Sequence, residues 1–182
     1  SVPTDGTVNV AAGEYEIEGI VVDKEGVSII GPGIGGEVER AYVVANDCAS
    51  PPAAAFHLHA DGITLQGLDI DGNGCTHVVH TGDLSEIQVN GVTVSDNVIH
   101  GGTYGVTLSW GSIDDKENPN VVSGNNINEN STGVLIESAF DNIVEKNNIS
   151  GNEKGIELSV CDGCGLGSPS GNIIRENTIT EN

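Results

Sequence analysis

The sequence is poor in basic residues, and this scarcity excludes several classes of partner. Its 182 residues include six Lys and Arg against 27 Asp and Glu, which gives a formal net charge of −21. Phosphate binding needs clustered cations, so nucleic acid is not expected as a partner, and anionic membrane surfaces are disfavoured for the same reason. The acidic residues are scattered rather than blocked. They predict the solvated surface of a halophilic protein, with extracellular cation binding as the alternative.

Long apolar runs, a zinc signature and aromatic residues are missing as well. No apolar stretch approaches the length of a membrane span, so membrane insertion is not expected. Cys161 and Cys164 form one CxxC pattern, but neither a second CxxC nor a spaced His pair follows, which argues against zinc. With Cys48 and Cys75, these cysteines allow three disulfide pairings, and disulfides or buried thiols are expected. Aromatic residues make up 3% of the chain, so an extended sugar cleft would lack stacking platforms.

The chain does contain a repeat, which is clearest between Val121 and Asn182. The segments VVSGNNINENSTGVLIE, IVEKNNISGNEKGIELS and IIRENTITEN align one beneath another, with Ile127, Ile149 and Ile179 spaced 22 and 30 residues apart. A period of this length is typical of a solenoid. The aligned asparagines form two columns, Asn125, Asn147 and Asn177, and Asn130, Asn152 and Asn182.

Each repeat holds three short strand-like pieces separated by Asn or Gly, residues that tolerate the left-handed backbone of a sharp corner. The asparagine columns are therefore expected to form structural ladders, in which side-chain amides hydrogen-bond from rung to rung. Inward Ile, Val and Leu would stack about 4.8 Å apart and form a continuous core. The predicted fold class is all-β, a parallel β-helix solenoid with three short strands per rung, in a single domain over residues 1–182.

The pattern N-x-I-x-x-N followed by G-I-x-L resembles the right-handed parallel β-helix repeats of the pectin-lyase-like superfamily, and NosD-like surface and periplasmic proteins in particular. The opening DGTVNVAAGEYEIEGIVVDKEGVSIIGPG resembles first rungs, so the resemblance covers nearly the whole chain. That superfamily includes lyases, hydrolases, epimerases, phage spikes and non-enzymes, so the resemblance implies a fold and no activity. The lyase-type arginine pattern and the epimerase-type Tyr-Gly-x-Asp-Pro-His run are absent. Copper binding is implied by the NosD resemblance alone.

Irregular segments between the repeats give further expectations. Tyr15 to Val22 alternates apolar and polar residues and predicts one half-buried strand. Glu37 to Phe56 is the least regular part, and we expect a rung whose long loop caps the amino-terminal end. Two loops, Gly111 to Asn120 and Ser159 to Gly171, should leave the solenoid on one side, which in solenoids is often the binding face.

One acid/base constellation can be assembled from the rung alignment. Asp69 and Asp71 would lie on the outer face one rung from His100, close enough for a carboxylate to raise the imidazole pKa. These residues are catalytic candidates if the protein is an enzyme, a polysaccharide lyase or a glycoside hydrolase. We favour the alternative, a solvated acidic face beside a surface histidine. Arg40 and Arg175 would lie rungs apart, which weakens the lyase hypothesis.

Other side chains are candidates for binding or modification. Tyr104 and Trp110 flank one strand and are candidate ligand-binding rings, with core packing as the alternative. Asn148 and Asn130 match the glycosylation sequon, and Asn148 is the better acceptor because Asn130 belongs to a ladder.

The histidines are paired in the sequence, as His57 with His59 and His77 with His80. His77 and His80 would point to opposite faces of a single strand, so no metal site is predicted. No cofactor is expected, although calcium stays open.

The preferred function is a secreted or cell-surface structural or adhesive module, with weak glycan or divalent-cation binding. The alternative is a glycan-active enzyme acting on the outer face. The chain begins at Ser1 without Met, as a processed or excised chain does, and stops at the corner position Asn182. We therefore expect end-to-end assembly of identical copies into a filament, with polysaccharide as a further partner.

Overall fold

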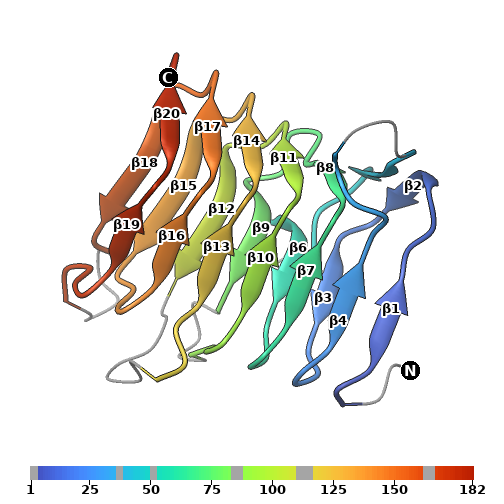
Figure 1. Ribbon diagram of the computed structural model, residues 1–182, viewed down its shortest axis with the longest axis horizontal. Coiled ribbons are helices and arrows are strands. Elements are labelled where there is room, and N and C mark those ends of the chain that lie inside the picture. The colour runs from blue at the N-terminus through green and yellow to red at the C-terminus, as the bar shows by residue number, and fades with distance from the viewer. Residues whose placement is uncertain (1–3, 36–38, 50–52, 83–87, 110–116, 162–166) are drawn as a thin grey trace.

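The computed structural model describes residues 4–35, 39–49, 53–82, 88–109, 117–161 and 167–182. Within these residues the chain forms twenty short strands and no helix, so no helix long and apolar enough to cross a membrane is found there. The strands make three sheets, each entirely parallel, that wind into a right-handed parallel β-helix (Figure 1). The fold class predicted from the repeat is confirmed.

Each complete turn of the chain adds one strand to each sheet. Sheet A contains β1 (Thr7–Asn9), β4 (Ser28–Ile30), β7 (Thr64–Gln66), β10 (Thr93–Ser95), β13 (Val121–Ser123), β16 (Ile143–Glu145) and β19 (Ile173–Arg175). Sheet B contains β2 (Gly13–Ile17), β5 (Ala41–Ala45), β8 (Asp69–Asp71), β11 (Val98–His100), β14 (Asn126–Asn128), β17 (Asn148–Ser150) and β20 (Thr178–Thr180). Sheet C contains β3 (Ile20–Val22), β6 (Ala54–Leu58), β9 (His77–Thr81), β12 (Tyr104–Ser109), β15 (Thr132–Glu137) and β18 (Lys154–Ser159).

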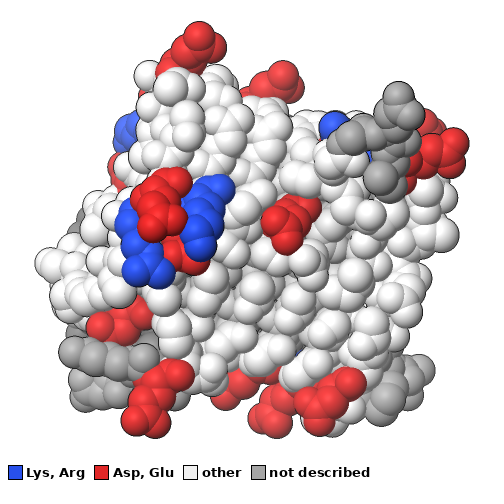
Figure 2. All heavy atoms as spheres, in the orientation of Figure 1, with Lys and Arg blue, Asp and Glu red and all other residues white. Residues whose placement is uncertain are grey.

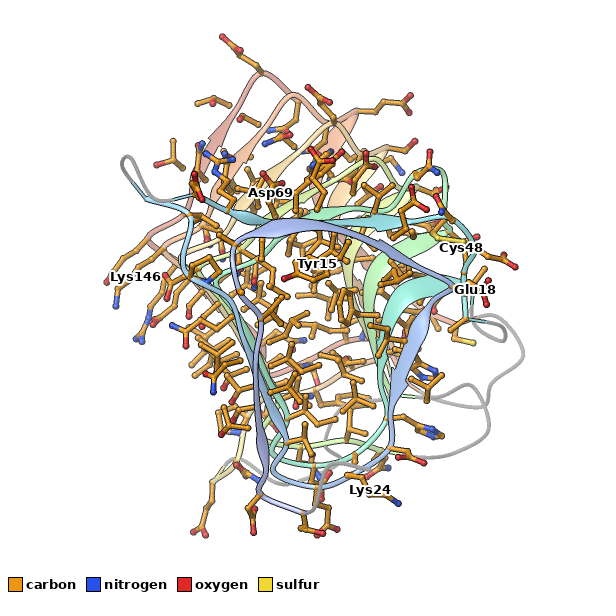
Figure 3. The ribbon with its side chains drawn as sticks, turned by 90° about the vertical axis from the view of Figure 1, so that its right-hand side faces the viewer. Tyr15, Glu18, Lys24, Cys48, Asp69 and Lys146 are labelled. Atoms are coloured by element: carbon orange, nitrogen blue, oxygen red, sulfur yellow. A yellow bond between two sulfur atoms is a disulfide. The ribbon has the colours of Figure 1, made fainter. Side chains whose placement is uncertain are left out.

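The core is a column of aliphatic side chains between the three sheets (Figure 3). In sheet B, register pairs Ile70 with Ile99, Ile99 with Ile127, and Ile127 with Ile149, and all four are fully buried. Successive residues of a strand face opposite sides, so their neighbours along each strand face outward. The outward columns of sheet B are therefore the ones that the rung alignment predicts.

Asparagine ladders stabilise the corners between the sheets. At the corner between sheets A and B, the Asn97 side-chain amide donates to Asn125 Oδ1 at 3.1 Å, Asn125 to Asn147 at 3.0 Å, and Asn147 to Asn177 at 3.0 Å. Each of the first three also donates to a backbone carbonyl of the rung before it. Because these amides are buried, the ladder satisfies backbone groups that would otherwise lack partners.

Two further ladders lie at the other corners. Between sheets B and C, Asn130 donates to Asn152 at 3.2 Å and Asn152 to Asn182 at 2.8 Å. Between sheets C and A, Asn142 donates to Asn172 Oδ1 at 2.9 Å, a pair outside the two asparagine columns of the repeat. All three corners are thus held by the same kind of hydrogen bond between asparagine side chains.

The left-handed backbone of the corners lies one residue earlier than expected. Positive φ occurs at the residue that precedes each ladder asparagine, and the ladder residues themselves are not left-handed. The preceding residues at the A–B corner are Asp96 (φ 54°), Gly124 (φ 67°), Lys146 (φ 57°) and Glu176 (φ 57°). The bend and the ladder hydrogen bonds are therefore made by different residues. A glycine or a solvated polar residue adopts the left-handed backbone, and the asparagine that follows it points its amide inward.

One expectation about the first rungs was wrong, and another was confirmed. The residues from Tyr15 to Val22 form two strands, β2 and β3, because Gly19, with φ of 74°, turns the chain between them. The 37–56 segment provides the regular strands β5 and β6, which pair in register with β2 and β3. The expected rung is therefore confirmed, whereas residues 36–38 and 50–52 lie outside the described residues, so a capping loop stays a prediction. Tyr15 lies over an apolar hollow of about 690 Å³ at this end (Figure 3).

The two long loops follow strands of the same sheet, β12 and β18 of sheet C. Residues 110–116 and 162–166, which make up much of them, lie outside the described residues. The side on which these loops lie therefore stays a prediction.

Charge is unevenly distributed over the face formed by sheet A. Figure 2 shows a largely uncharged sheet surface, with acidic residues mainly toward its rims. A mixed-charge patch over β16 and β19 contains the ion pairs of Glu145 with Arg175, at 2.6 Å, and with Lys146, at 3.4 Å. Much of the acidity thus lies at solvated corners, where several left-handed residues are Asp or Glu.

Candidate functional site

A polar cluster lies on the outer face of sheet B, where β5, β8 and β11 are adjacent. We call Arg40, Tyr42, Asp69, Asp71 and His100 the Asp69 cluster. Parallel register pairs Tyr42 with Asp69 and Asp71 with His100. The structure thus brings the three catalytic candidates together and adds two residues from the preceding rung.

The groups of the Asp69 cluster pair with one another. Arg40 Nη1 donates to Asp69 Oδ2 at 2.8 Å, and His100 Nε2 lies 3.2 Å from Asp69 Oδ1. The other ring nitrogen of His100 is 4.0 Å from Asp71 Oδ1. The Tyr42 hydroxyl donates to Asp71 Oδ2 at 2.9 Å. The two carboxylates therefore each have cationic or hydroxyl partners on both sides.

These contacts shift the protonation equilibria of the cluster. Burial by itself would raise the pKa of Asp69, but hydrogen bonds from His100 and Arg40 outweigh it and the pKa is lowered. The hydrogen bond to Asp69 raises the pKa of His100 against the opposing effect of burial. Burial and the hydrogen bond to Asp71 raise the pKa of the Tyr42 phenol. Each shift favours a carboxylate–imidazolium pair beside a neutral phenol.

Arg40 and Tyr42 were missed because the segment before β5 was read as irregular. A signal was present in the sequence, since Arg40 precedes Asp69 by 29 residues and Tyr42 precedes Asp71 by the same interval. Extending the rung alignment one turn upstream would have placed both residues beside the aspartates. Arg40 and Arg175 do lie rungs apart, as expected, because Arg40 precedes β5 and Arg175 ends β19.

The candidate ligand-binding rings are not assembled with this cluster. Tyr104 starts β12 of sheet C, and its ring stacks on His77 with centroids 5.3 Å apart. Trp110 lies outside the described residues. Of the two sequons, Asn148 is exposed on the outer face of sheet B, whereas Asn130 is 5% exposed and bonded within its ladder.

A second cluster, not predicted from the sequence, contains four of the five histidines. We call His57, His59, His77 and His80 the histidine cluster; it lies on the outer face of sheet C, mainly on β6 and β9. His80 meets His57 edge to face with ring centroids 5.3 Å apart, and His77 in the same manner at 4.6 Å. His59 stacks on His57 at 4.9 Å with nearly parallel planes.

The expectation that His77 and His80 face opposite ways was wrong. Val78 and Val79 both belong to the buried core, so the chain turns two consecutive side chains inward between the histidines. At the position of Val78, later rungs have Gly105 and Gly133, and a Cβ added to either glycine would meet core atoms. This corner geometry breaks the simple alternation of a strand and keeps both imidazoles out of the aliphatic core, although His80 is itself buried.

Fixed polar contacts orient two of these rings. Nε2 of His57 contacts the carbonyl oxygen of Gly82, which can only accept, so this nitrogen carries the proton. Nδ1 of His77 is 2.7 Å from Thr107 Oγ1. Burial, with a smaller contribution from His57, lowers the pKa of His77 to about 4. His77 is therefore a neutral imidazole near pH 7.

The structure shows one of the disulfide pairings that the sequence left open. Cys48 and Cys75 form a disulfide that joins the segment after β5 to the segment before β9. Cys161 is also disulfide-bonded, and Cys164 lies outside the described residues. As they stand, no three His, Cys, Asp or Glu side chains in the described part of the chain form a group that could hold a metal ion.

Comparison with known proteins gives one family. The family model described as "Periplasmic copper-binding protein (NosD)" matches residues 8–182, nearly the whole chain. A search of curated proteins gave no match.

Proposed function

Since the chain belongs to the NosD family of periplasmic copper-binding proteins, we propose that it is a non-catalytic β-helix scaffold that works outside the cytoplasm and binds carbohydrate on the outer face of sheet B. The family description supports the location. The Cys48–Cys75 disulfide supports it independently, because disulfides persist mainly in oxidising compartments.

Mutual pairing within the Asp69 cluster is the observation that carries the non-catalytic assignment. A glycoside hydrolase needs a carboxylic acid whose pKa is raised, so that it still holds a proton to give to the leaving group. The pKa of Asp69 is instead lowered by His100 and Arg40. A lyase needs a base free to accept a proton, yet His100 has a raised pKa and already contacts Asp69.

The same face is well suited to a hydroxyl-rich ligand. Carboxylate oxygens accept hydrogen bonds from hydroxyls, and Arg40, half exposed, has further N–H groups to donate. Beyond the cluster, the outward residues of the next rungs are short, uncharged and polar. They are Asn126, Asn128, Asn148, Ser150, Thr178 and Thr180. A polymer lying across the strands would meet a polar side chain about every 4.8 Å.

Copper is named in the family description, but no donor set ready to hold it is found among the described residues. Imidazole is a ligand type that copper favours, and the histidine cluster concentrates four imidazoles. These rings stack or meet edge to face, and no three of them form a group that could hold an ion. The carboxylates of the Asp69 cluster are harder ligands and already occupied by cationic partners.

Affinity electrophoresis through gels containing neutral or acidic polysaccharide tests the proposal, with and without calcium. We expect retardation of the wild-type chain, weakened by Asp69→Asn and unchanged by the control Glu157→Gln on sheet C. The same mixtures are assayed for reducing ends and unsaturated products. Absence of retardation by every polysaccharide overturns the binding function. Turnover that His100→Gln abolishes would establish the enzyme alternative instead.

A further inference from the structure

The outer face of sheet A carries almost no charge, although the chain as a whole is strongly acidic. In each strand of this sheet the middle residue faces the core side, so the first and third residues face outward. Parallel register stacks the outward residues into two columns. The columns are Thr7, Ser28, Thr64, Thr93, Val121, Ile143 and Ile173, and Asn9, Ile30, Gln66, Ser95, Ser123, Glu145 and Arg175. Among these residues, all of which the structure describes, only Glu145 and Arg175 are charged, and they pair with each other at 2.6 Å.

Acidic residues lie around the rims of this face and on the other two sheets. Figure 2 shows the acidic side chains mainly toward the edges of the sheet A surface. The rim residues include Asp61 and Asp141 at the corner between sheets C and A, and Asp96 and Glu176 at the corner between sheets A and B. The outward residues of sheet B include Glu14, Glu16, Asp69 and Asp71, and those of sheet C include Glu137 and Glu157. Sheet A is thus the face on which the outward strand charges cancel.

Part of this uncharged face is apolar. Val121, Ile143 and Ile173 are consecutive in one outward column, so their side chains stand about 4.8 Å apart in a continuous aliphatic strip. Ile173 is 45% exposed, and the other two are half-buried. Toward the amino-terminal end the same column continues with short hydroxyl side chains from β10, β7 and β4. Depletion of charge around an apolar strip is the composition of the core of a protein–protein interface.

A second copy of this chain is the partner that fits such a face. Two chains with a net charge of −21 repel each other wherever their acidic corners meet, so they can approach closely only where charge is absent or paired. A basic protein would be drawn to the acidic rims rather than to this face. Sheets pack face to face about 10 Å apart with interdigitating side chains, and the short outward residues of sheet A suit such packing.

From this charge distribution we propose that two copies pack sheet A against sheet A in a two-fold dimer that salt strengthens. Seven strands about 4.8 Å apart, each with its corners covering about five residues of roughly 3.3 Å, give a face of roughly 30 by 17 Å, or roughly 500 Å² per copy. Roughly 1,000 Å² in the pair is at the low end of specific interfaces, so the dimer is weak and reversible. Salt strengthens it because salt screens the repulsion between acidic rims across the contact.

The two-fold contact closes after two copies, because each copy presents one such face. It leaves the outer face of sheet B open, and it does not depend on carbohydrate binding there.

Sedimentation equilibrium of the disulfide-intact chain, from micromolar to millimolar concentration, tests the dimer in dilute buffer and in molar potassium chloride. We expect a species of twice the 18.7 kDa chain mass in high salt, and mostly monomer in dilute buffer. Ile143→Asp places a like charge from each copy in the contact and should raise the dissociation constant at least tenfold. Asn148→Asp is the matched control, because it adds the same charge to the same rung on the outer face of sheet B, and it should change the constant less than threefold.

Hydroxyl-radical footprinting of the wild-type chain needs no variant, and so decides the matter even if Ile143→Asp does not fold. Ile143 and Ile173 should lose reactivity as the dimer forms, whereas end-to-end association would protect Leu158 and Ile179 instead. Protection confined to Leu158 and Ile179, a chain that stays monomeric at millimolar concentration in high salt, or equal effects of the two variants overturns the proposal. A monomer whose retardation by polysaccharide is lost in Ile143→Asp also overturns it and assigns the face to a glycan.

Discussion

Replacing a ladder asparagine gives the sharpest test of how the rungs are held in register. Asn147 is 1% exposed, and its Oδ1 accepts hydrogen bonds from the backbone N–H and the side-chain amide of Asn125, at 2.9 and 3.0 Å. Its Nδ2 donates to the Val122 carbonyl at 2.9 Å and to Asn177 Oδ1 at 3.0 Å. Asn147→Leu keeps the side chain's approximate volume and removes all four bonds.

The expected loss follows from these partners. A buried donor or acceptor left without its partner costs about 1–3 kcal/mol, and a buried leucine regains part of this through apolar contact. We therefore expect the free energy of unfolding to fall by about 2–4 kcal/mol. For a domain of this size, each kcal/mol lowers the melting temperature by roughly 2–4 °C, so the expected shift is roughly 4–16 °C.

The matched control is Asn126→Leu, which lies on the outer face of the preceding rung. Asn126 lies on the outer face of sheet B, and its side chain receives one bond, from Asn148 Nδ2 at 3.2 Å. Its replacement should cost less than about 0.5 kcal/mol. Both variants are compared by calorimetry and urea unfolding. Equal shifts in the two would refute the claim that buried amide ladders hold the rungs.

Four further outcomes are expected. With a net charge of −21, self-repulsion should fall as salt screens it, so the melting temperature should rise between dilute buffer and molar potassium chloride; a flat curve would contradict the halophile interpretation. His77, with a folded pKa of about 4, stays neutral in the metal-free folded chain, while the unfolded chain takes up a proton below about pH 6.5. The free energy of unfolding should therefore fall from pH 6.5 to 4, by at most about 3 kcal/mol, and a His77→Gln variant with the same pH slope would be evidence against this. The Cys48–Cys75 disulfide spans 27 residues. Replacing both cysteines by serine should lower the free energy of unfolding by about 3 kcal/mol, measured by denaturant unfolding. An unchanged unfolding midpoint would show that the bond does not restrain the unfolded chain. End-to-end assembly also stays a prediction: Leu158, Ile174 and Ile179 are exposed on the last rungs, and sedimentation should show growing assemblies that deletion of residues 1–10 abolishes. A chain that stays monomeric at high concentration would remove that hypothesis.

The sequence by itself determined the architecture and the register of the later rungs. Each rung places one aliphatic anchor and one asparagine at the same positions, so aligning Ile127 with Ile149 also aligns every outward residue between the corners. A one-residue slip would bury polar side chains and break the ladder at Asn125 and Asn147, and this makes the register strongly specified. The proximity of Asp69, Asp71 and His100 follows from that register alone, and for this reason it was visible without a structure.

Only the tertiary structure decided how the irregular rungs join this pattern. The segment around β5 lacks the asparagine repeat, so only the 29-residue interval to the aspartates, and no local motif, indicated that Arg40 and Tyr42 align with them. The histidine cluster depends on a corner at which Val78 and Val79 both turn inward, a departure from alternation that a strand pattern does not express. The Cys48–Cys75 pairing likewise depends on which two rungs are stacked. Repeats encode register through local periodicity, whereas contacts between unlike rungs exist only once the stack has formed. The positions of Arg40 and Tyr42 beside the aspartates, and the whole histidine cluster, depend on such contacts.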